Sequence, residues 1–170
     1  MGNSFLRSLF ILCLAWSGLL AETLHESIAR FKSYSTSINS NIRPGDALPL
    51  IGSDTNVSWL GRVVDFEVQR NDDEISLDFY CVYIPVLGFE GNDVRVGKEK
   101  GELFLLSLRT QQLDVSQISY MQAEIAEKPH YMLIVGIPAH VRLYKGEQVV
   151  QIAAFWASIR DDFLTSILPN

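Results

Sequence analysis

The sequence predicts a mostly β protein, and three observations favour this class. From residue 59 onward, apolar and polar residues alternate with a period of two along several segments. Turn residues separate these segments, and a helical pattern interrupts them between the third and the fourth. This element order predicts a five-stranded antiparallel barrel or roll resembling an OB-type barrel, with an N-terminal helix and a short C-terminal helix. A β-sandwich is the alternative. We expect a leader over 1–21, a helix and linker over 22–56, and a β-domain over 57–170.

Residues 1–21 have the pattern of a secretory signal peptide. Arg7 is the only charged residue in this stretch, an apolar run covers Leu9–Leu20, and the small residue Ala21 follows. The run is too short to span a bilayer, which takes roughly 20 apolar residues. We therefore expect the protein to be exported to the periplasm or the extracellular space, with only transient membrane contact during export.

Cysteine usage favours an envelope location. The chain has two cysteines, and removal of the leader would take Cys13 with it. Cys81 would then have no intramolecular partner, whereas small secreted animal domains usually depend on disulfides. A bacterial periplasm or envelope fits this pattern better. Cys81 alternates in step with apolar neighbours, so we interpret it as a small core residue rather than a reactive thiol.

The mature chain begins with a helix signal. Thr23 is followed three residues later by Glu26, which is a capping-box pattern, and apolar residues then recur at near-helical spacing. This predicts a helix over 24–37. The stretch 39–56 is rich in proline, glycine and polar residues, which predicts a linker or a surface loop.

A β-hairpin is the next expected element. Segments 59–69 and 74–86 alternate with a period of two around an Arg-Asn-Asp-Asp turn. On the first strand we expect one apolar face, made of Leu60, Val64, Phe66 and Val68. On the second strand we expect an inward face made of Ile75, Leu77, Phe79, Cys81 and Tyr83.

The opposite face of the second strand predicts an interaction surface. Tyr80, Val82 and Ile84 form an apolar row on a face that is otherwise polar, so either the N-terminal helix or a partner protein should cover it. Residues 87–101 contain four glycines and many charges, which predicts a long exposed loop. The predicted partner surface consists of Tyr80, Val82, Ile84, Phe89 and Arg95.

The second half of the chain should add three strands and two helical segments. Pro138 cannot donate to a strand ladder, so it predicts a bulge, a bend or an edge position. A Lys145-Gly146 turn should join the last two strands. The strands are expected over 102–108, 130–144 and 147–159, and the final helix over 161–168. Residues 114–127 fit a helix better than a strand, although their alternation permits either.

Composition and motifs disfavour several kinds of chemistry. Fourteen basic and 20 acidic residues give a net charge of −6, which disfavours nucleic-acid binding. His130 and His140 lie too far apart along one strand to share a zinc ion, and we expect both on its solvated face. Glu99 stands where a P-loop needs Ser or Thr, and no Gly-x-Ser-x-Gly elbow occurs. We predict no metal and no cofactor.

Two functional hypotheses remain. The first is an exported, non-catalytic binding or structural module of the cell envelope, which contacts another envelope protein through the 87–101 loop or apolar strand edges. The alternative is an enzyme acting on envelope polymers or small molecules. That enzyme would need carboxylates and histidines to converge in one pocket, and the candidates are Glu67, Asp78, His130 and His140.

Overall fold

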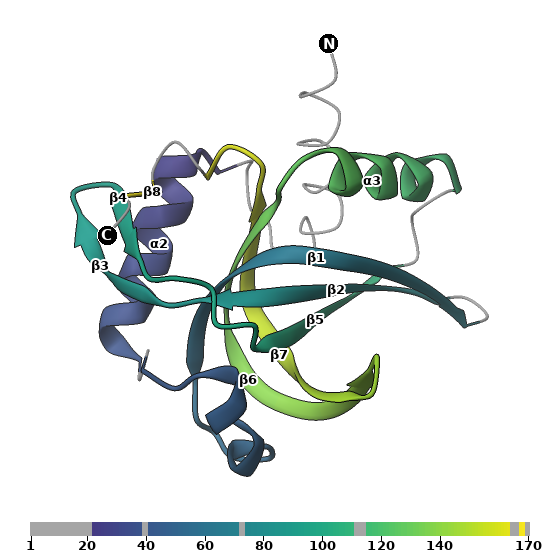
Figure 1. The fold of residues 1–170 in the computed structure, drawn as a ribbon, viewed down its shortest axis with the longest axis horizontal. Helices are drawn as coiled ribbons and strands as arrows, with labels where there is room; N and C mark the ends of the chain where they lie inside the picture. The colour runs from purple at the N-terminus through teal and green to yellow at the C-terminus, as the bar shows by residue number, and fades with distance from the viewer. Residues whose placement is uncertain (1–21, 39–40, 72–73, 111–114, 164–166, 169–170) are drawn as a thin grey trace.

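The computed structural model describes residues 22–38, 41–71, 74–110, 115–163 and 167–168, and it is mostly β (Figure 1). The predicted leader, 1–21, lies outside the described residues. In chain order the elements are α2 (Leu24–Ser37), the 3-10 turns η2 (Pro44–Asp46) and η3 (Leu48–Leu50), β1 (Val57–Asn71), β2 (Glu74–Ile84), β3 (Val86–Glu90), β4 (Asp93–Val96), β5 (Leu103–Thr110), α3 (Val115–Glu127), β6 (Tyr131–Tyr144), β7 (Glu147–Arg160) and β8 (Ile167–Leu168).

The main sheet has five strands in the order β1-β2-β5-β7-β6, and β6 also pairs with β1, so the order closes on itself. The prediction that all strands are antiparallel was wrong, because β5 and β7 are parallel. The reason is geometric. An odd number of strands cannot alternate in direction around a closed order, so at least one neighbouring pair must be parallel.

A second, three-stranded sheet has the order β3-β4-β8 and corrects two further predictions. Part of the expected exposed loop over 87–101 is the β3–β4 hairpin, whose turn uses Gly91 at a φ of 63°. Val94 is fully buried on this hairpin because α2 covers it. The expected C-terminal helix over 161–168 is also wrong where it is described, since Ile167–Leu168 pair in parallel with β4.

The β1–β2 hairpin and the helical interpretation of 114–127 are confirmed. The predicted face of β1 is partly wrong, because a β-bulge shifts the register between Val63 and Asp65. The bulge turns Val63 and Phe66 inward and leaves Val64 40% exposed. His130 is also buried rather than solvated, and its Nδ1 lies 2.9 Å from the Lys128 carbonyl oxygen.

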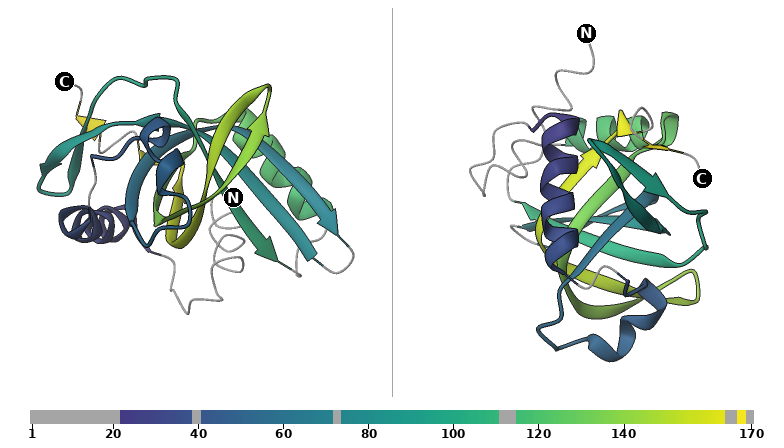
Figure 2. Two further views of the ribbon diagram at one scale, coloured as in Figure 1. Left: turned by 90° about the horizontal axis from the view of Figure 1, so that it is seen from below. Right: turned by 90° about the vertical axis from the view of Figure 1, so that its left-hand side faces the viewer.

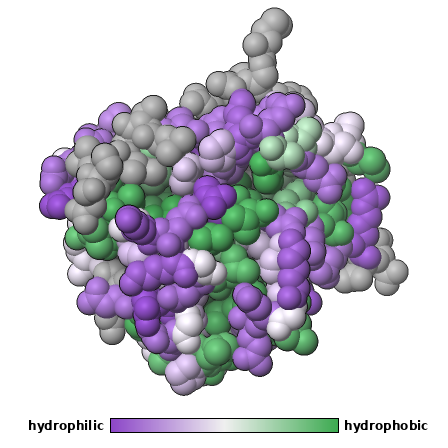
Figure 3. All heavy atoms as spheres, viewed as in Figure 1, coloured by the Kyte–Doolittle hydropathy of each residue, from purple (hydrophilic) through white to green (hydrophobic). Residues whose placement is uncertain are grey.

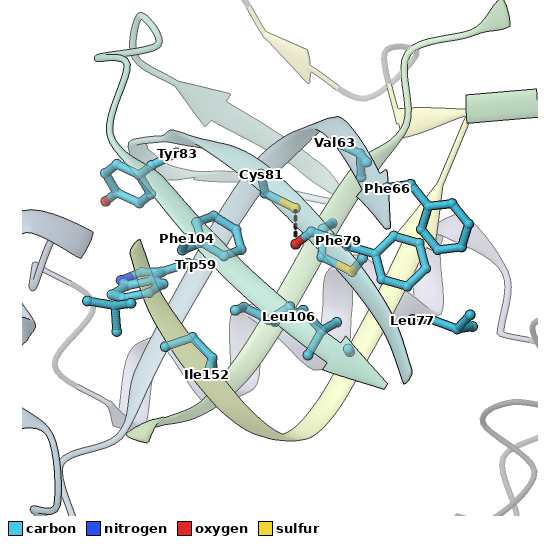
Figure 4. Close-up of a cluster of buried hydrophobic side chains, with 14 of the residues drawn as sticks. Trp59, Val63, Phe66, Leu77, Phe79, Cys81, Tyr83, Phe104, Leu106 and Ile152 are labelled. Carbon is cyan, nitrogen blue, oxygen red and sulfur yellow. Dashed lines mark hydrogen bonds between the residues drawn. The ribbon is translucent and has the colours of Figure 1, made fainter. Parts of the chain in front are cut away.

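The main core lies inside the closed strand order (Figure 4). Trp59, Phe79, Cys81, Phe104 and Leu106 are all fully buried there, as the interpretation of Cys81 expected. Elements outside the sheet close both ends. Ile118 and Met121 of α3 pack into one end, and Ala47, between η2 and η3, packs into the other. Figures 1 and 2 show α3 and the 3-10 turns at opposite ends.

Helix α2 forms a second core on the side of the sheet (Figure 2). It begins with the predicted capping box, in which the Glu26 N–H donates to Thr23 Oγ1 (3.3 Å) and the Thr23 N–H donates to Glu26 Oε2 (2.7 Å). Ile28 and Phe31 are fully buried against β6 and β7. Both parts of the 22–56 segment, helix and 3-10 turns, therefore pack directly on the strands.

Candidate functional site: the outer half of the β6–β7 hairpin

The β6–β7 hairpin divides into two halves with different neighbours. Residues 131–136 of β6 pair with β1 on one side and with β7 on the other. Residues 137–144 pair with β7 alone, so within the described part of the chain their other edge has no strand beside it. Pro138 sits in this second half next to a register shift, which agrees with the predicted bulge or edge position.

The hairpin turn determines which backbone groups face the open edge. Lys145 and Gly146 form a two-residue turn with positive φ angles of 51° and 87°, the pattern of a type I′ turn. Tyr144 and Glu147 close that turn as a hydrogen-bonded pair, and the alternation then makes Val141 and Leu143 members of non-hydrogen-bonded pairs. Their N–H and C=O groups point away from β7, toward the open edge.

The side chains at this edge are also exposed. Leu143 is 76% exposed and Val141 is 41% exposed. Both lie on the same face of β6, because they are two residues apart on one strand. These two side chains are therefore apolar surface outside the core. Figure 3 shows that the face drawn there also carries apolar residues, in a band between polar ones.

The opposite face of the hairpin tip is fastened to the main sheet. The Tyr144 ring stacks on Tyr80 of β2, with the ring centroids 3.9 Å apart and the planes at 20°. The Tyr144 hydroxyl donates a hydrogen bond to Asp65 Oδ2, and Lys145 Nζ lies 3.2 Å from the same oxygen. We call Asp65, Tyr80, Tyr144 and Lys145 the tyrosine latch.

The electrostatics of the tyrosine latch are those of a structural contact. Burial raises the pKa of the Asp65 carboxyl, but hydrogen bonds from Tyr144, Lys145 and the Phe66 N–H outweigh it, and the net pKa lies below the usual value. Burial, together with the neighbouring Glu67, raises the pKa of Tyr80 to about 12. The pKa of Asp65 and the pKa of Tyr80 are thus both shifted away from neutral pH, whereas a general acid or base is most effective when its pKa lies near the working pH.

A pocket of about 140 Å³ lies on the β7 side of the hairpin tip. Its walls come from three elements that are far apart in the sequence: the η2–η3 segment, the start of β5 and the start of β7. Glu102 is held in its wall, because its Oε2 accepts the Gly45 N–H at 3.1 Å and its Oε1 lies 3.4 Å from Arg43 Nη1.

The five residues predicted as a partner surface do not lie together as one exposed patch. Tyr80 is 4% exposed beneath Tyr144, and Ile84 is 4% exposed in the core under α2. Val82 is half-buried, and Phe89 packs edge-on against Phe31. Arg95 is exposed and pairs with Glu90 at 3.4 Å. The helix and the hairpin tip of the chain itself thus cover Ile84 and Tyr80.

The residues named for the enzymatic alternative do not converge. Glu67 and Asp78 oppose each other on β1 and β2, where Asp78 accepts hydrogen bonds from Gln69 and Ser76, both at 3.0 Å. His130 is buried just before β6, and His140 is exposed on its outer half. Among the described residues, no group of three His, Cys, Asp or Glu side chains is placed to hold a metal ion.

Sequence reasoning named apolar strand edges in general as a contact surface, but it did not place the open edge at Val141 and Leu143, and it missed the pocket. Val141 and Leu143 continue the alternation of Tyr131 and Leu133, so the pattern predicts the same burial for all four. Val141 and Leu143 are more exposed because they lie beyond Gly136, the last residue of β6 that pairs with β1. The position at which this pairing ends is set by the register of the two strands, which the hydropathy pattern does not show. The pocket walls come from distant segments, and no local pattern predicts their contact.

Comparisons with models of known protein families, with curated proteins and with solved structures find no match to this chain. Among the described residues, none of the helices has the length and apolar character needed to cross a membrane.

Proposed function

We propose that this chain is an exported, non-catalytic binding or structural module of the cell envelope that acts through protein–protein contacts. The observation that carries the proposal is the open edge of β6, where Val141 and Leu143 combine exposed side chains with outward-facing backbone groups. Open strand edges of this kind accept a strand from another chain, and the main-chain hydrogen bonds supply affinity.

We also propose that the main sheet is an OB-type fold. This proposal is supported by the chain order of the main-sheet strands and α3, which is β1, β2, β5, α3, β6, β7 when the inserted β3–β4 hairpin is left out. A helix between the third and the fourth of five strands is the element order of an OB-type fold. OB-type folds bind ligands on the face of their second and third strands. Here Tyr144 covers Tyr80 on that face, so the proposed partner contact lies at the hairpin edge instead.

The leader supports the envelope location. Its short apolar run with a single preceding arginine is typical of a secretory signal, and the lone cysteine of the remaining chain fits a compartment in which the domain does not depend on disulfides. Export and the envelope partner are therefore proposed together, and one experiment can address both.

The test is site-specific photo-crosslinking of the full chain in a bacterial host. A photoreactive residue replaces Leu143, and a matched control carries it at Val115, which is 62% exposed on α3 at the other end of the sheet. We expect an adduct with one discrete envelope protein from position 143 and none from position 115, on protein that has lost residues 1–21. Cytoplasmic protein that retains Met1, or identical adducts from both positions, would contradict the proposal.

A further inference from the structure

The pocket beside the hairpin tip combines an apolar floor with an acidic rim. Leu48, Leu103 and Val150 supply aliphatic side chains to its lining, and Glu102 and Glu147 supply carboxylates. An amphipathic side chain with an aliphatic stem and a cationic head is complementary to this arrangement, because the stem contacts the floor while the head stays near the rim.

The charged residues in the lining of the pocket are acidic. Arg43 pairs with Glu102 of the lining at 3.4 Å, and it also pairs with Asp46 at 3.0 Å, so two carboxylates already engage its guanidinium. The Glu147 side chain is exposed, and its carboxylate makes no hydrogen bond or ion pair with any described residue. Glu102 and Glu147 are the two charged residues of the pocket lining, which therefore carries a formal net charge of −2.

The size of the pocket limits what it can hold. At about 140 Å³ it is smaller than the roughly 300–1,000 Å³ typical of small-molecule sites. It has room for one long side chain. Binding energy in protein interfaces concentrates in a few anchor residues that fill such pockets, and arginine is enriched among them.

The pocket also lies next to the strand that carries the open edge. Gln148, in the pocket wall, lies directly opposite Leu143 in the β6–β7 register, and Val150 lies opposite Val141. A partner segment on the edge would therefore pass within one strand of the pocket mouth.

We propose that this pocket binds a lysine or arginine side chain of the partner protein. The inference rests on the proposed function, because it assigns the chemistry of the residue that anchors the partner. The anchor is a cationic side chain with an aliphatic stem, and the Glu147 carboxylate forms the ion pair with its charged group. Glu102, which Gly45 and Arg43 hold in place, is the second carboxylate of the rim.

The experiment titrates the full chain with four capped amino acids and follows the backbone amide signals of Gly101 and Gln148 by NMR. The probes are the N-acetyl methylamides of lysine, arginine, norleucine and glutamate. Norleucine has the lysine stem without the charge, and glutamate reverses the charge. We expect saturable binding of lysine and arginine with a Kd on the order of 1–10 mM, as befits a single side chain. Norleucine should bind at least about fivefold more weakly, and glutamate should not bind.

Variants identify the carboxylate. Glu147→Gln should weaken lysine and arginine binding at least about threefold, and Glu147→Lys should abolish it. The control is Glu127→Gln, which removes the same charge from an exposed position at the end of α3 and should leave Kd unchanged. Both Glu147 variants should fold normally, because the described residues give its carboxylate no partner.

Equal affinity for norleucine and lysine, or equal Kd values for Glu147→Gln and Glu127→Gln, would overturn the inference. Those results would leave the proposed function standing if position 143 still crosslinks to an envelope protein. Loss of the crosslink with intact lysine binding would instead count against the proposed function alone.

Discussion

The two halves of the β6–β7 hairpin share one sequence pattern but have opposite environments. In the inner half, Met132 and Ile134 point into the main core while Leu133 and Val135 pack under α2, so both faces are buried. In the outer half, Tyr144 is fastened to the main sheet while Leu143 remains exposed. The difference comes from the neighbours, because β1 pairs with the inner half only. Burial on a strand is therefore decided by register as much as by hydropathy.

The largest expected effect separates the halves directly. Ile134→Ala should lower the free energy of unfolding by about 2–5 kcal/mol, because it leaves a cavity in the main core. Leu143→Ala, on the same strand, should change it by less than about 0.5 kcal/mol, since the side chain is already in solvent. Urea denaturation of both variants measures the difference. Similar losses in both would show that the outer half is buried as well.

The second prediction concerns the close approach of β6 and β7. A Cβ at Gly136 would lie 2.4 Å from the Ala153 carbonyl oxygen, so Gly136→Ala should lower the free energy of unfolding by about 1–3 kcal/mol. Gly88→Ala is the matched control, because nothing lies within 4 Å of its added Cβ. Thermal unfolding should find the control within about 0.5 kcal/mol of the parent. Equal stability of the two variants would contradict the packing described for the inner half.

The third prediction concerns the tyrosine latch. Tyr144→Phe keeps the ring stack on Tyr80 but removes the hydrogen bond to Asp65. It should therefore lower the free energy of unfolding by about 1 kcal/mol. Tyr34→Phe is the control, because the contacts given for Tyr34 are made by its ring. Urea denaturation at neutral pH compares the two. A loss in the control as large as that of Tyr144→Phe would mean that the hydroxyl of the latch contributes nothing specific.

The smallest effect depends on pH. The pKa of Asp65 is lowered in the folded protein, so the stability it contributes is present above its unfolded value of about 3.9 and is lost as the pH falls through the folded value. Asp65→Asn should therefore destabilise the protein by less than about 1 kcal/mol at neutral pH, because the site is partly exposed. Denaturant titrations at a series of pH values should show this difference shrinking as the pH falls below the unfolded pKa of about 3.9 and through the lower folded pKa. If the stability difference between the parent and Asp65→Asn instead grew as the pH fell, the pKa of Asp65 would be raised in the folded protein, contrary to this prediction.

Local patterns in the sequence predict most elements of the fold. The capping box at Thr23 and Glu26 marks the start of α2, and period-two alternation marks the β1–β2 hairpin. Both patterns depend on residues that are close in the sequence, so they can be recognised without knowledge of the tertiary contacts. The C-terminal segment was misjudged because Ile167–Leu168 are a strand only through their pairing with β4, which lies about 70 residues earlier in the chain.

Little of the candidate site could be predicted in the same way. The apolar row of Tyr80, Val82 and Ile84 predicted a second surface covered by the N-terminal helix or by a partner protein. Helix α2 does cover Ile84, but nothing in the pattern indicated that the hairpin tip would cover Tyr80. The bulge at Val63 and Asp65 and the pocket wall at Glu102 both depend on contacts between distant segments. Hydropathy carries no information about such contacts.

Hydrogen exchange of the free full chain tests the central claim most directly, which is that the outer half of β6 has an open edge. We predict slow exchange at Ile134, and exchange at Val141 and Leu143 that is orders of magnitude faster, with Arg142 between them protected by its pairing to Val149. Protection at Val141 and Leu143 equal to that at Ile134, in a protein that is monomeric by light scattering, would contradict the account.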